Sequence, residues 1–189
     1  MKTKNLFLSV ISLLTLSLLL LSCSNNSSNK KTSTKKNKNN FYEIITKSSD
    51  GDFRGYTLNV TTKDDILKSE EISPENSNSE DELTYKYQID DYNRYDVYYK
   101  LENGKLAFIS LTYYSYENDG QKAYQNGKEL FDILFDEYKA KYGDEPRKFA
   151  EQDYIWNTTS KNNSKLKVEL LNTGREGESG TVEILFQIL

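Results

Sequence analysis

Two stretches with alternating apolar and polar residues, 83–90 and 94–101, give the clearest pattern in this chain. In the first, LTYKYQID, and again in the second, RYDVYYKL, every second residue is apolar. Successive side chains of a strand point to opposite faces of a sheet, so this period of two indicates two strands that each bury one face.

The Asn-Gly dipeptide at residues 103–104 predicts a hairpin turn after the second strand. Both central residues of a type I′ turn need positive φ, which Asn and Gly tolerate best. Pairing Glu102 with Lys105 across this turn would place Tyr99 opposite Phe108. The pattern therefore predicts a third strand that runs antiparallel to the second.

The apolar positions of this third strand change phase after Phe108, to Ile109, Leu111 and Tyr113. A period of two cannot change phase without an extra residue or a second covered face. We expect either a β-bulge near residues 108–109 or a sheet that is apolar on both faces there.

A spacing of three and four residues predicts a long helix over residues 121–142. Asn118 or Asp119 is positioned to cap its start, and Gly143 with Pro146 to end it. Of the apolar side chains, Leu130, Leu134 and Tyr138 are expected to pack on the sheet. The apolar positions as a whole are Ala123, Tyr124, Gly127, Leu130, Phe131, Leu134, Phe135, Tyr138 and Tyr142.

The rest of the chain after residue 40 predicts five more strands and a short helix. The strands are expected at 41–47, 53–61, 154–159, 166–172 and 181–189. Thr62 would cap the short helix, which would end near Glu71. We therefore expect an α+β fold, an antiparallel β-sheet meander with one long helix packed across one face and one short helix.

The helix end at 138–146, with its KYG and proline, followed by Trp156 and two strands, resembles small bacterial envelope modules. The pattern is weakly similar to the SmpA/OmlA-like and β-lactamase-inhibitor-like families. This resemblance implies a fold type, and no functional residue is carried over from it.

The first 23 residues are similar to the signal peptide and lipobox of bacterial lipoproteins. Lys2 and Lys4 precede an apolar segment over 6–21, and the segment ends at Leu20-Leu21-Ser22-Cys23. The resemblance implies a signal peptide over 1–22 and acyl chains on Cys23. These chains would anchor the protein outside the cytoplasm, on the cell membrane or the outer membrane. The alternatives are a plain signal peptide with an incidental cysteine and an uncleaved N-terminal helix.

Residues 23–40 are predicted to form a lipidated cysteine and a disordered tether, because no apolar side chain follows Cys23 there. The tether has five lysines and no acidic residue, whereas 41–189, the expected single domain, has 18 basic and 29 acidic residues. The resulting charge of −11 disfavours nucleic-acid binding.

The composition predicts a domain that is not an enzyme and uses no metal or cofactor. The alternative is catalysis by a Ser–Lys pair or by paired carboxylates, which no motif marks. The chain has no histidine, and its single cysteine is Cys23. No P-loop, G-x-G-x-x-G or G-x-S-x-G motif is present. Asp50-Gly51-Asp52 has oxygen ligands suited to calcium, but it lacks EF-hand spacing, so a turn over residues 48–52 is the preferred interpretation.

The fifteen tyrosines suggest a binding surface. Tyr98, Tyr113, Tyr114 and Tyr116 do not fit the assigned core face, and we select Tyr98 and Tyr114 as candidate ligand-binding residues. The alternative is that tyrosine merely favours strands and that the second face is covered. The sequence predicts a non-catalytic binding or scaffolding domain with a protein or glycan partner. The alternative function is that of a glycan-binding or small-molecule-binding module that uses exposed tyrosines.

Overall fold

The computed structural model describes residues 41–76, 78–143 and 146–189, which belong to one compact unit, Lys36–Leu189. The predicted signal peptide over 1–22 and the predicted lipidated Cys23 with its tether to residue 40 lie outside the described residues. Those expectations therefore stay predictions.

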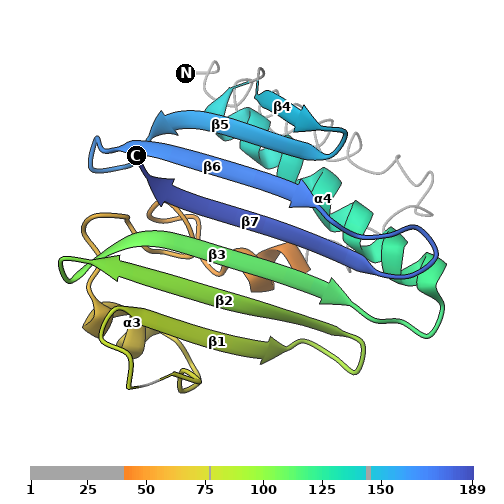
Figure 1. Ribbon diagram of the computed structural model, residues 1–189, viewed down its shortest axis with the longest axis horizontal. Coiled ribbons are helices and arrows are strands. Elements are labelled where there is room, and N and C mark those ends of the chain that lie inside the picture. Colours follow the sequence, from red (N-terminus) through yellow and green to blue (C-terminus); the bar gives the residue numbers. More distant parts are fainter. Residues whose placement is uncertain (1–40, 77, 144–145) are drawn as a thin grey trace, which may run out of the picture. The chain divides into compact units, whose positions relative to one another are not determined.

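The sheet has seven antiparallel strands in the order β1-β2-β3-β7-β6-β5-β4 (Figure 1). The α+β expectation is confirmed, but the sheet is larger than a single meander. The last strand, β7, inserts beside β3 and joins a three-stranded to a four-stranded meander. The strands are β1 Glu82–Gln88, β2 Asn93–Glu102, β3 Lys105–Ser115, β4 Arg147–Ala150, β5 Asp153–Thr159, β6 Lys165–Asn172 and β7 Gly180–Ile188. Strand β4 was not predicted from the sequence.

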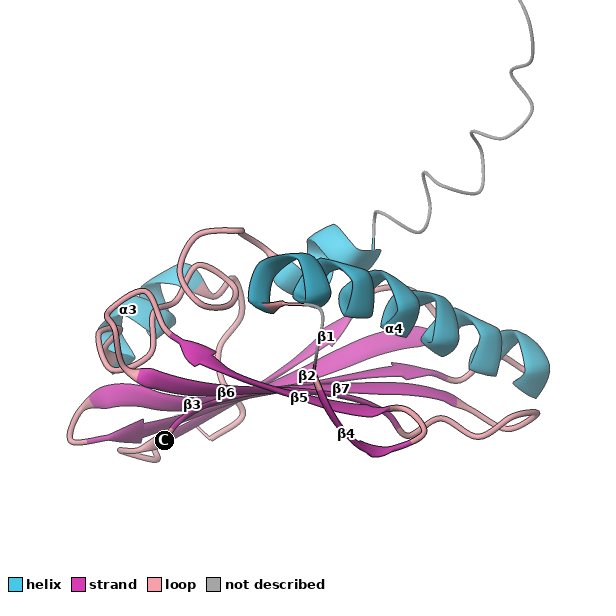
Figure 2. Cartoon of the chain, turned by 90° about the horizontal axis from the view of Figure 1, so that it is seen from above, coloured by secondary structure: helices cyan, strands magenta, loops and turns pink. Residues whose placement is uncertain are grey.

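The helices all lie on one face of the sheet (Figure 2). The long helix α4, Gly120–Tyr142, begins after Asp119, whose carboxylate accepts hydrogen bonds from two backbone N–H groups of the first turn. Its predicted core face is confirmed, because Leu130, Leu134 and Tyr138 are buried. After the helix ends, the Trp156 Nε1–H donates to the Gly143 carbonyl over 3.1 Å and ties β5 to the end of α4.

Two glycines let α4 cross the start of β7 closely. A Cβ added at Gly127 would lie 2.7 Å from the Gly180 Cα, and one added at Gly180 would lie 2.0 Å from the Ala123 carbonyl oxygen. No real Cβ tolerates these separations from backbone, so both positions require glycine. This contact fixes the height of the helix above the sheet.

The short helix α3, Lys63–Ser69, begins where the sequence predicted. Thr62 caps it in a reciprocal capping box with Asp65: the Thr62 side chain accepts from the Asp65 N–H, and the Asp65 carboxylate accepts from the Thr62 N–H. Ile66 turns its side chain into the core. The capping pattern was sufficient because it is local in the sequence.

The β-bulge lies one residue earlier than expected. Leu101 pairs with Leu106 as predicted, but Tyr99 pairs with Ile109 and not with Phe108. Ala107 is the extra residue, and it returns the following apolar side chains to the core face. The structure therefore corrects the placement of Tyr113, which is fully buried.

The strands predicted at 41–47 and 53–61 are wrong. Residues 41–46 form a helical turn, which buries Ile45 through helical spacing. Residues 53–61 form tight turns with a single bridge between Phe53 and Tyr56. Positive φ angles at Arg54 and Asn59 bend the chain there and prevent a continuous strand.

Candidate functional site: the open face of the sheet

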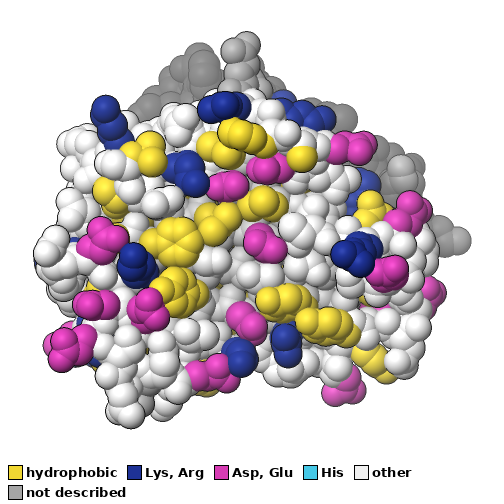
Figure 3. Space-filling model, viewed as in Figure 1, with side chains coloured by type: hydrophobic (Ala, Val, Ile, Leu, Met, Phe, Trp, Pro, Cys, Tyr) yellow, Lys and Arg dark blue, Asp and Glu magenta, His cyan; other side chains and the backbone are white. Residues whose placement is uncertain are grey.

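The open face is the side of the sheet that carries no helix. Within 41–76, 78–143 and 146–189, every helix and the loop over residues 47–62 lie on the other side of the sheet (Figure 2). Strand residues that point to this side are mostly half-exposed, whereas their neighbours in the strand are buried. Figure 3 shows the open face: apolar side chains form separate clusters across the strands, with charged side chains between them.

Tyr98 lies on the open face, as its position in β2 predicted. Its ring meets the ring of Phe108 edge-on, with the centroids 6.1 Å apart. Burial and a hydrogen bond to Glu82 raise the pKa of Tyr98 to about 12. A shallow hollow of about 510 Å³ adjoins the pair and includes Leu189, which is 63% exposed. The structure thus offers an aromatic and aliphatic patch at this end of the sheet.

Tyr114 lies on the same face at the other end of β3. Its ring stacks on that of Tyr116, with centroids 5.8 Å apart and planes 10° apart. The Arg94 guanidinium carbon lies 4.8 Å from the Tyr114 ring centroid and 5.3 Å from that of Tyr116. Stacked arginine and tyrosine side chains present a large, preformed surface that loses little side-chain entropy on binding.

Two polar atoms beside Tyr114 lack hydrogen-bond partners among the described residues. They are Arg94 Nε and Asp96 Oδ1, both shielded from solvent. Burial raises the pKa of Asp96, and Asp96 in turn contributes, after burial, to the raised pKa of Tyr114. The two atoms are an unpaired donor and an unpaired acceptor within this part of the sheet.

A second cluster, centred on Glu70, is buried on the helical side of the sheet. Arg54 Nη2 lies 3.2 Å from Glu70 Oε2, and both side chains are 1% exposed. The hydroxyls of Tyr56, Tyr87 and Tyr99 all donate to the Glu70 carboxylate. The cluster joins α3, the 53–61 loop and strands β1 and β2.

The Glu70 carboxylate is held in its ionised form by its neighbours. Burial alone would raise the pKa of Glu70, but the Arg54 guanidinium and the hydroxyls of Tyr87 and Tyr99 outweigh it and lower the pKa to about 2. Burial also raises the pKa of Tyr99 well above its ordinary value. A general acid or base needs a pKa near the working pH, so neither group is suited to that role.

The Glu70 cluster was not predicted from the sequence, although the sequence held one indication of it. The alternation along residues 83–90 and 94–101 places Tyr85, Tyr87, Tyr95 and Tyr99 on the core-facing side. Buried tyrosine hydroxyls usually need hydrogen-bond partners. Their number could have indicated a buried polar group, but only the fold shows that Glu70 is that group.

In the Asp50–Asp52 turn, the Asp52 carboxylate holds two backbone segments together. Asp52 Oδ2 accepts from the Leu58 N–H over 2.8 Å, and Oδ1 accepts from the Lys161 N–H over 2.9 Å. In the part of the chain that the structure describes, no three or more His, Cys, Asp or Glu side chains are grouped to hold a metal ion. Over the same residues, no helix has the length and apolar character needed to cross a membrane.

Comparisons with protein-family models, curated proteins and solved structures gave no match to this chain. The similarity to SmpA/OmlA-like and β-lactamase-inhibitor-like modules therefore stays a prediction from the sequence, as does the lipobox at Cys23.

Proposed function

We propose that this chain is a lipid-anchored protein of the bacterial cell envelope, and that its domain binds another protein through the open face without catalysis. The observation that supports this most directly is the uncovered sheet face with its two aromatic patches, Tyr98–Phe108 and Tyr114–Tyr116. Tyrosine and arginine are enriched at the centres of protein interfaces, where few other residues contribute as much binding energy.

The geometry of the aromatic rings favours a protein over a glycan on this face. A sugar stacks on a free aromatic ring face. Tyr116 and Arg94 already lie against the Tyr114 ring, and Phe108 lies against Tyr98. The hollow beside Tyr98 is shallow, and the rest of the face is broad. A protein partner can cover both patches at once, whereas a small ligand would contact only one.

The proposed anchor sets where this binding takes place. Acyl chains on Cys23 would hold the domain at the membrane surface, outside the cytoplasm. The five lysines of residues 24–40 would be attracted to anionic lipid. The domain, with its net charge of −11, would be held away from the lipid. The domain would therefore stay accessible to a partner in the envelope.

The experiment is affinity capture from envelope extracts, with identification of bound proteins and glycans by mass spectrometry. The Tyr98→Ala and Tyr114→Ala variants should each weaken capture of the same protein, by more than about 1 kcal/mol when the affinity is measured with the purified partner. The matched control is Tyr124→Ala, because Tyr124 is a half-exposed tyrosine on α4, in the helical layer.

Binding should change little between about pH 6 and 8, because the chain has no histidine, and a chelator should not weaken it. Equal losses in all three tyrosine variants, or capture of a glycan alone, would contradict the proposal.

A further inference from the structure

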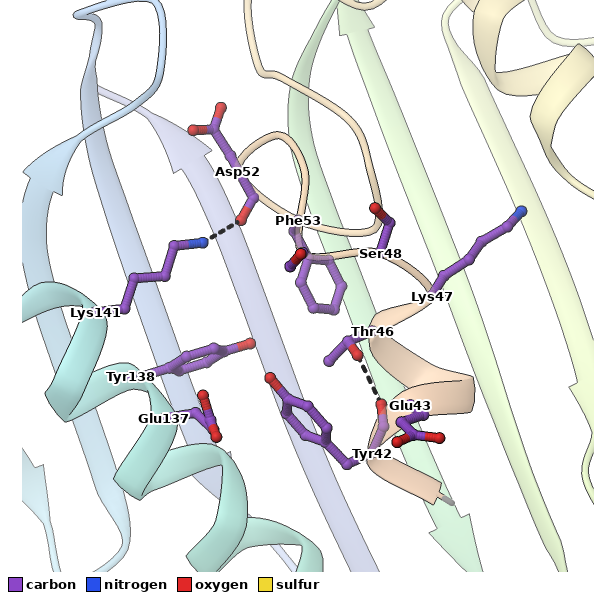
Figure 4. Close-up of a pocket in the computed structure, with 11 residues that line it drawn as sticks. Tyr42, Glu43, Thr46, Lys47, Ser48, Asp52, Phe53, Glu137, Tyr138 and Lys141 are labelled. Atoms are coloured by element: carbon purple, nitrogen blue, oxygen red, sulfur yellow. Dashed lines mark hydrogen bonds between the residues drawn. The ribbon is translucent and has the colours of Figure 1, made fainter. Parts of the chain in front are cut away.

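A cavity of about 350 Å³ opens between the helical turn at residues 41–46 and α4 (Figure 4). Small-molecule pockets have volumes of roughly 300–1,000 Å³, so the cavity has the size for a small ligand. It belongs to the helical side of the sheet and shares no residue with the open face. Phe53, which stacks on Phe186 at a centroid distance of 4.7 Å, provides an apolar wall.

Tyr138 of α4 directs a hydroxyl into this cavity that lacks a partner. The residue is 5% exposed, and its ring packs edge-on against Trp156 and Phe186. Its hydroxyl has no hydrogen-bond partner among the described residues. Figure 4 shows it pointing toward the Tyr42 hydroxyl across the open space. A buried hydroxyl without a partner costs free energy, which a ligand with a donor or acceptor at this point would recover.

The charged side chains around the cavity are largely committed elsewhere. Lys47 reaches away to the Ser69 carbonyl and Glu70. The Asp52 carboxylate accepts backbone N–H groups, as described above. Glu43 lies at the border of the cavity, where it also lines a second hollow together with Lys47 and Glu70.

The charges that remain beside Tyr138 are one of each sign, one helical turn apart on α4. They are Glu137 and Lys141, which both line the cavity. The Lys141 ammonium donates to the Asp52 carbonyl over 3.2 Å, which leaves further N–H groups for a ligand. This pair favours neither an anion nor a cation, and each tyrosine hydroxyl can both donate and accept.

We propose that the cavity binds a neutral, polyhydroxylated molecule of monosaccharide size. The hydroxyls of Tyr42 and Tyr138 would exchange hydrogen bonds with those of the ligand, and Glu137 and Lys141 would add one acceptor and one donor. The rings of Tyr42, Tyr138 and Phe53 would pack against its C–H groups. This site is independent of the open face, so either can fail without the other.

The test measures binding of glucose, galactose and N-acetylglucosamine to the full chain by calorimetry, in a detergent without a sugar head group. Glucosamine and glucuronate serve as charged comparisons of similar size. The Tyr138→Phe variant keeps the ring and removes only the hydroxyl. The matched control is Tyr85→Phe, because the Tyr85 hydroxyl is also buried without a partner but does not line the cavity.

The proposal predicts that at least one neutral sugar binds more tightly than both charged ones. Tyr138→Phe should weaken that binding by about fivefold or more, with an unchanged or higher melting temperature, and Tyr85→Phe should leave it unchanged. The proposal is overturned if none of the three neutral sugars binds, or if a charged comparison binds more tightly. Wild-type affinity in Tyr138→Phe, or an equal loss in both variants, would also overturn it.

Discussion

Arg54 and Glu70 form a buried ion pair, with 3.2 Å between Nη2 and Oε2, that connects the 53–61 loop to the end of α3. Both side chains of the pair make further hydrogen bonds. Arg54 also donates to the Ile45 carbonyl, and Glu70 accepts from three tyrosine hydroxyls. A buried pair with complete hydrogen bonding is costly to break, because either partner alone leaves an uncompensated charge in the core.

Glu70→Gln should therefore lower the free energy of unfolding by about 3–5 kcal/mol, measured by urea titration at pH 7. The control is Asp132→Asn, which removes an exposed pair with Lys128 on α4 and should cost about 0.5 kcal/mol or less. Similar losses in the two variants would show that the Glu70 cluster is not a principal source of stability.

The same variant tests the pH dependence. The pKa of Glu70 is about 2 in the folded protein against an ordinary 4.5, so its contribution is complete above pH 4.5 and is lost as the pH falls toward 2. The contribution amounts to about 3 kcal/mol. The difference in stability between wild type and Glu70→Gln should narrow over this range, and a constant difference would contradict the low pKa.

Leu134→Ala should cost about 2–5 kcal/mol, because Leu134 is fully buried between α4 and the sheet. Asp136→Ala, on the exposed side of the same helix, should change stability by less than about 0.5 kcal/mol. Chemical denaturation of both variants measures the difference. Equal effects would mean that α4 does not use this face in solution.

Gly127→Ala should destabilise the protein, although alanine is the better helix former by about 1 kcal/mol. The added Cβ would lie 2.7 Å from the Gly180 Cα, so α4 and β7 would have to separate. Gln125→Ala, at an exposed position of α4, should be neutral within about 0.5 kcal/mol. A more stable Gly127→Ala variant would rule out the close crossing of helix and strand.

The elements that the sequence predicted correctly are those specified by neighbouring residues. The Asn103-Gly104 turn, the capping box at Thr62 and the spacing of α4 each depend on a few adjacent positions. The helical turn at 41–46 is too short for its period to be distinguished from a strand, and its apolar residues fit both.

The features that the sequence could not give depend on contacts between distant segments. The insertion of β7 beside β3 and the meeting of Arg54 with Glu70 follow from the whole fold. For the candidate site, alternation along β2 placed Tyr98 on the face opposite the core, where the structure has it, but along β3 it could not decide between the neighbours Tyr113 and Tyr114. The exact position of the bulge decides the phase of β3, and it puts Tyr113 in the core and Tyr114 on the open face.

Cys23→Ala should leave an unlipidated or uncleaved protein that no longer partitions into the detergent phase. The reason is that Cys23 is the only cysteine of the chain and the residue that the lipobox resemblance selects. Mass spectrometry of the mature protein should find a diacylglycerol thioether on Cys23, and Ser22→Thr should serve as a mild control with retained processing. An unmodified Cys23 thiol in the mature protein would contradict the anchor.

The most direct test of the proposed function is photo-crosslinking in intact cells. A photoreactive phenylalanine analogue would replace Tyr98 or Tyr114 on the open face, or Asp136 on the exposed side of α4. We predict that the same protein is crosslinked from positions 98 and 114 and not from position 136. An absence of crosslinked protein at both open-face positions, or equal crosslinking at position 136, would contradict a binding function for the open face.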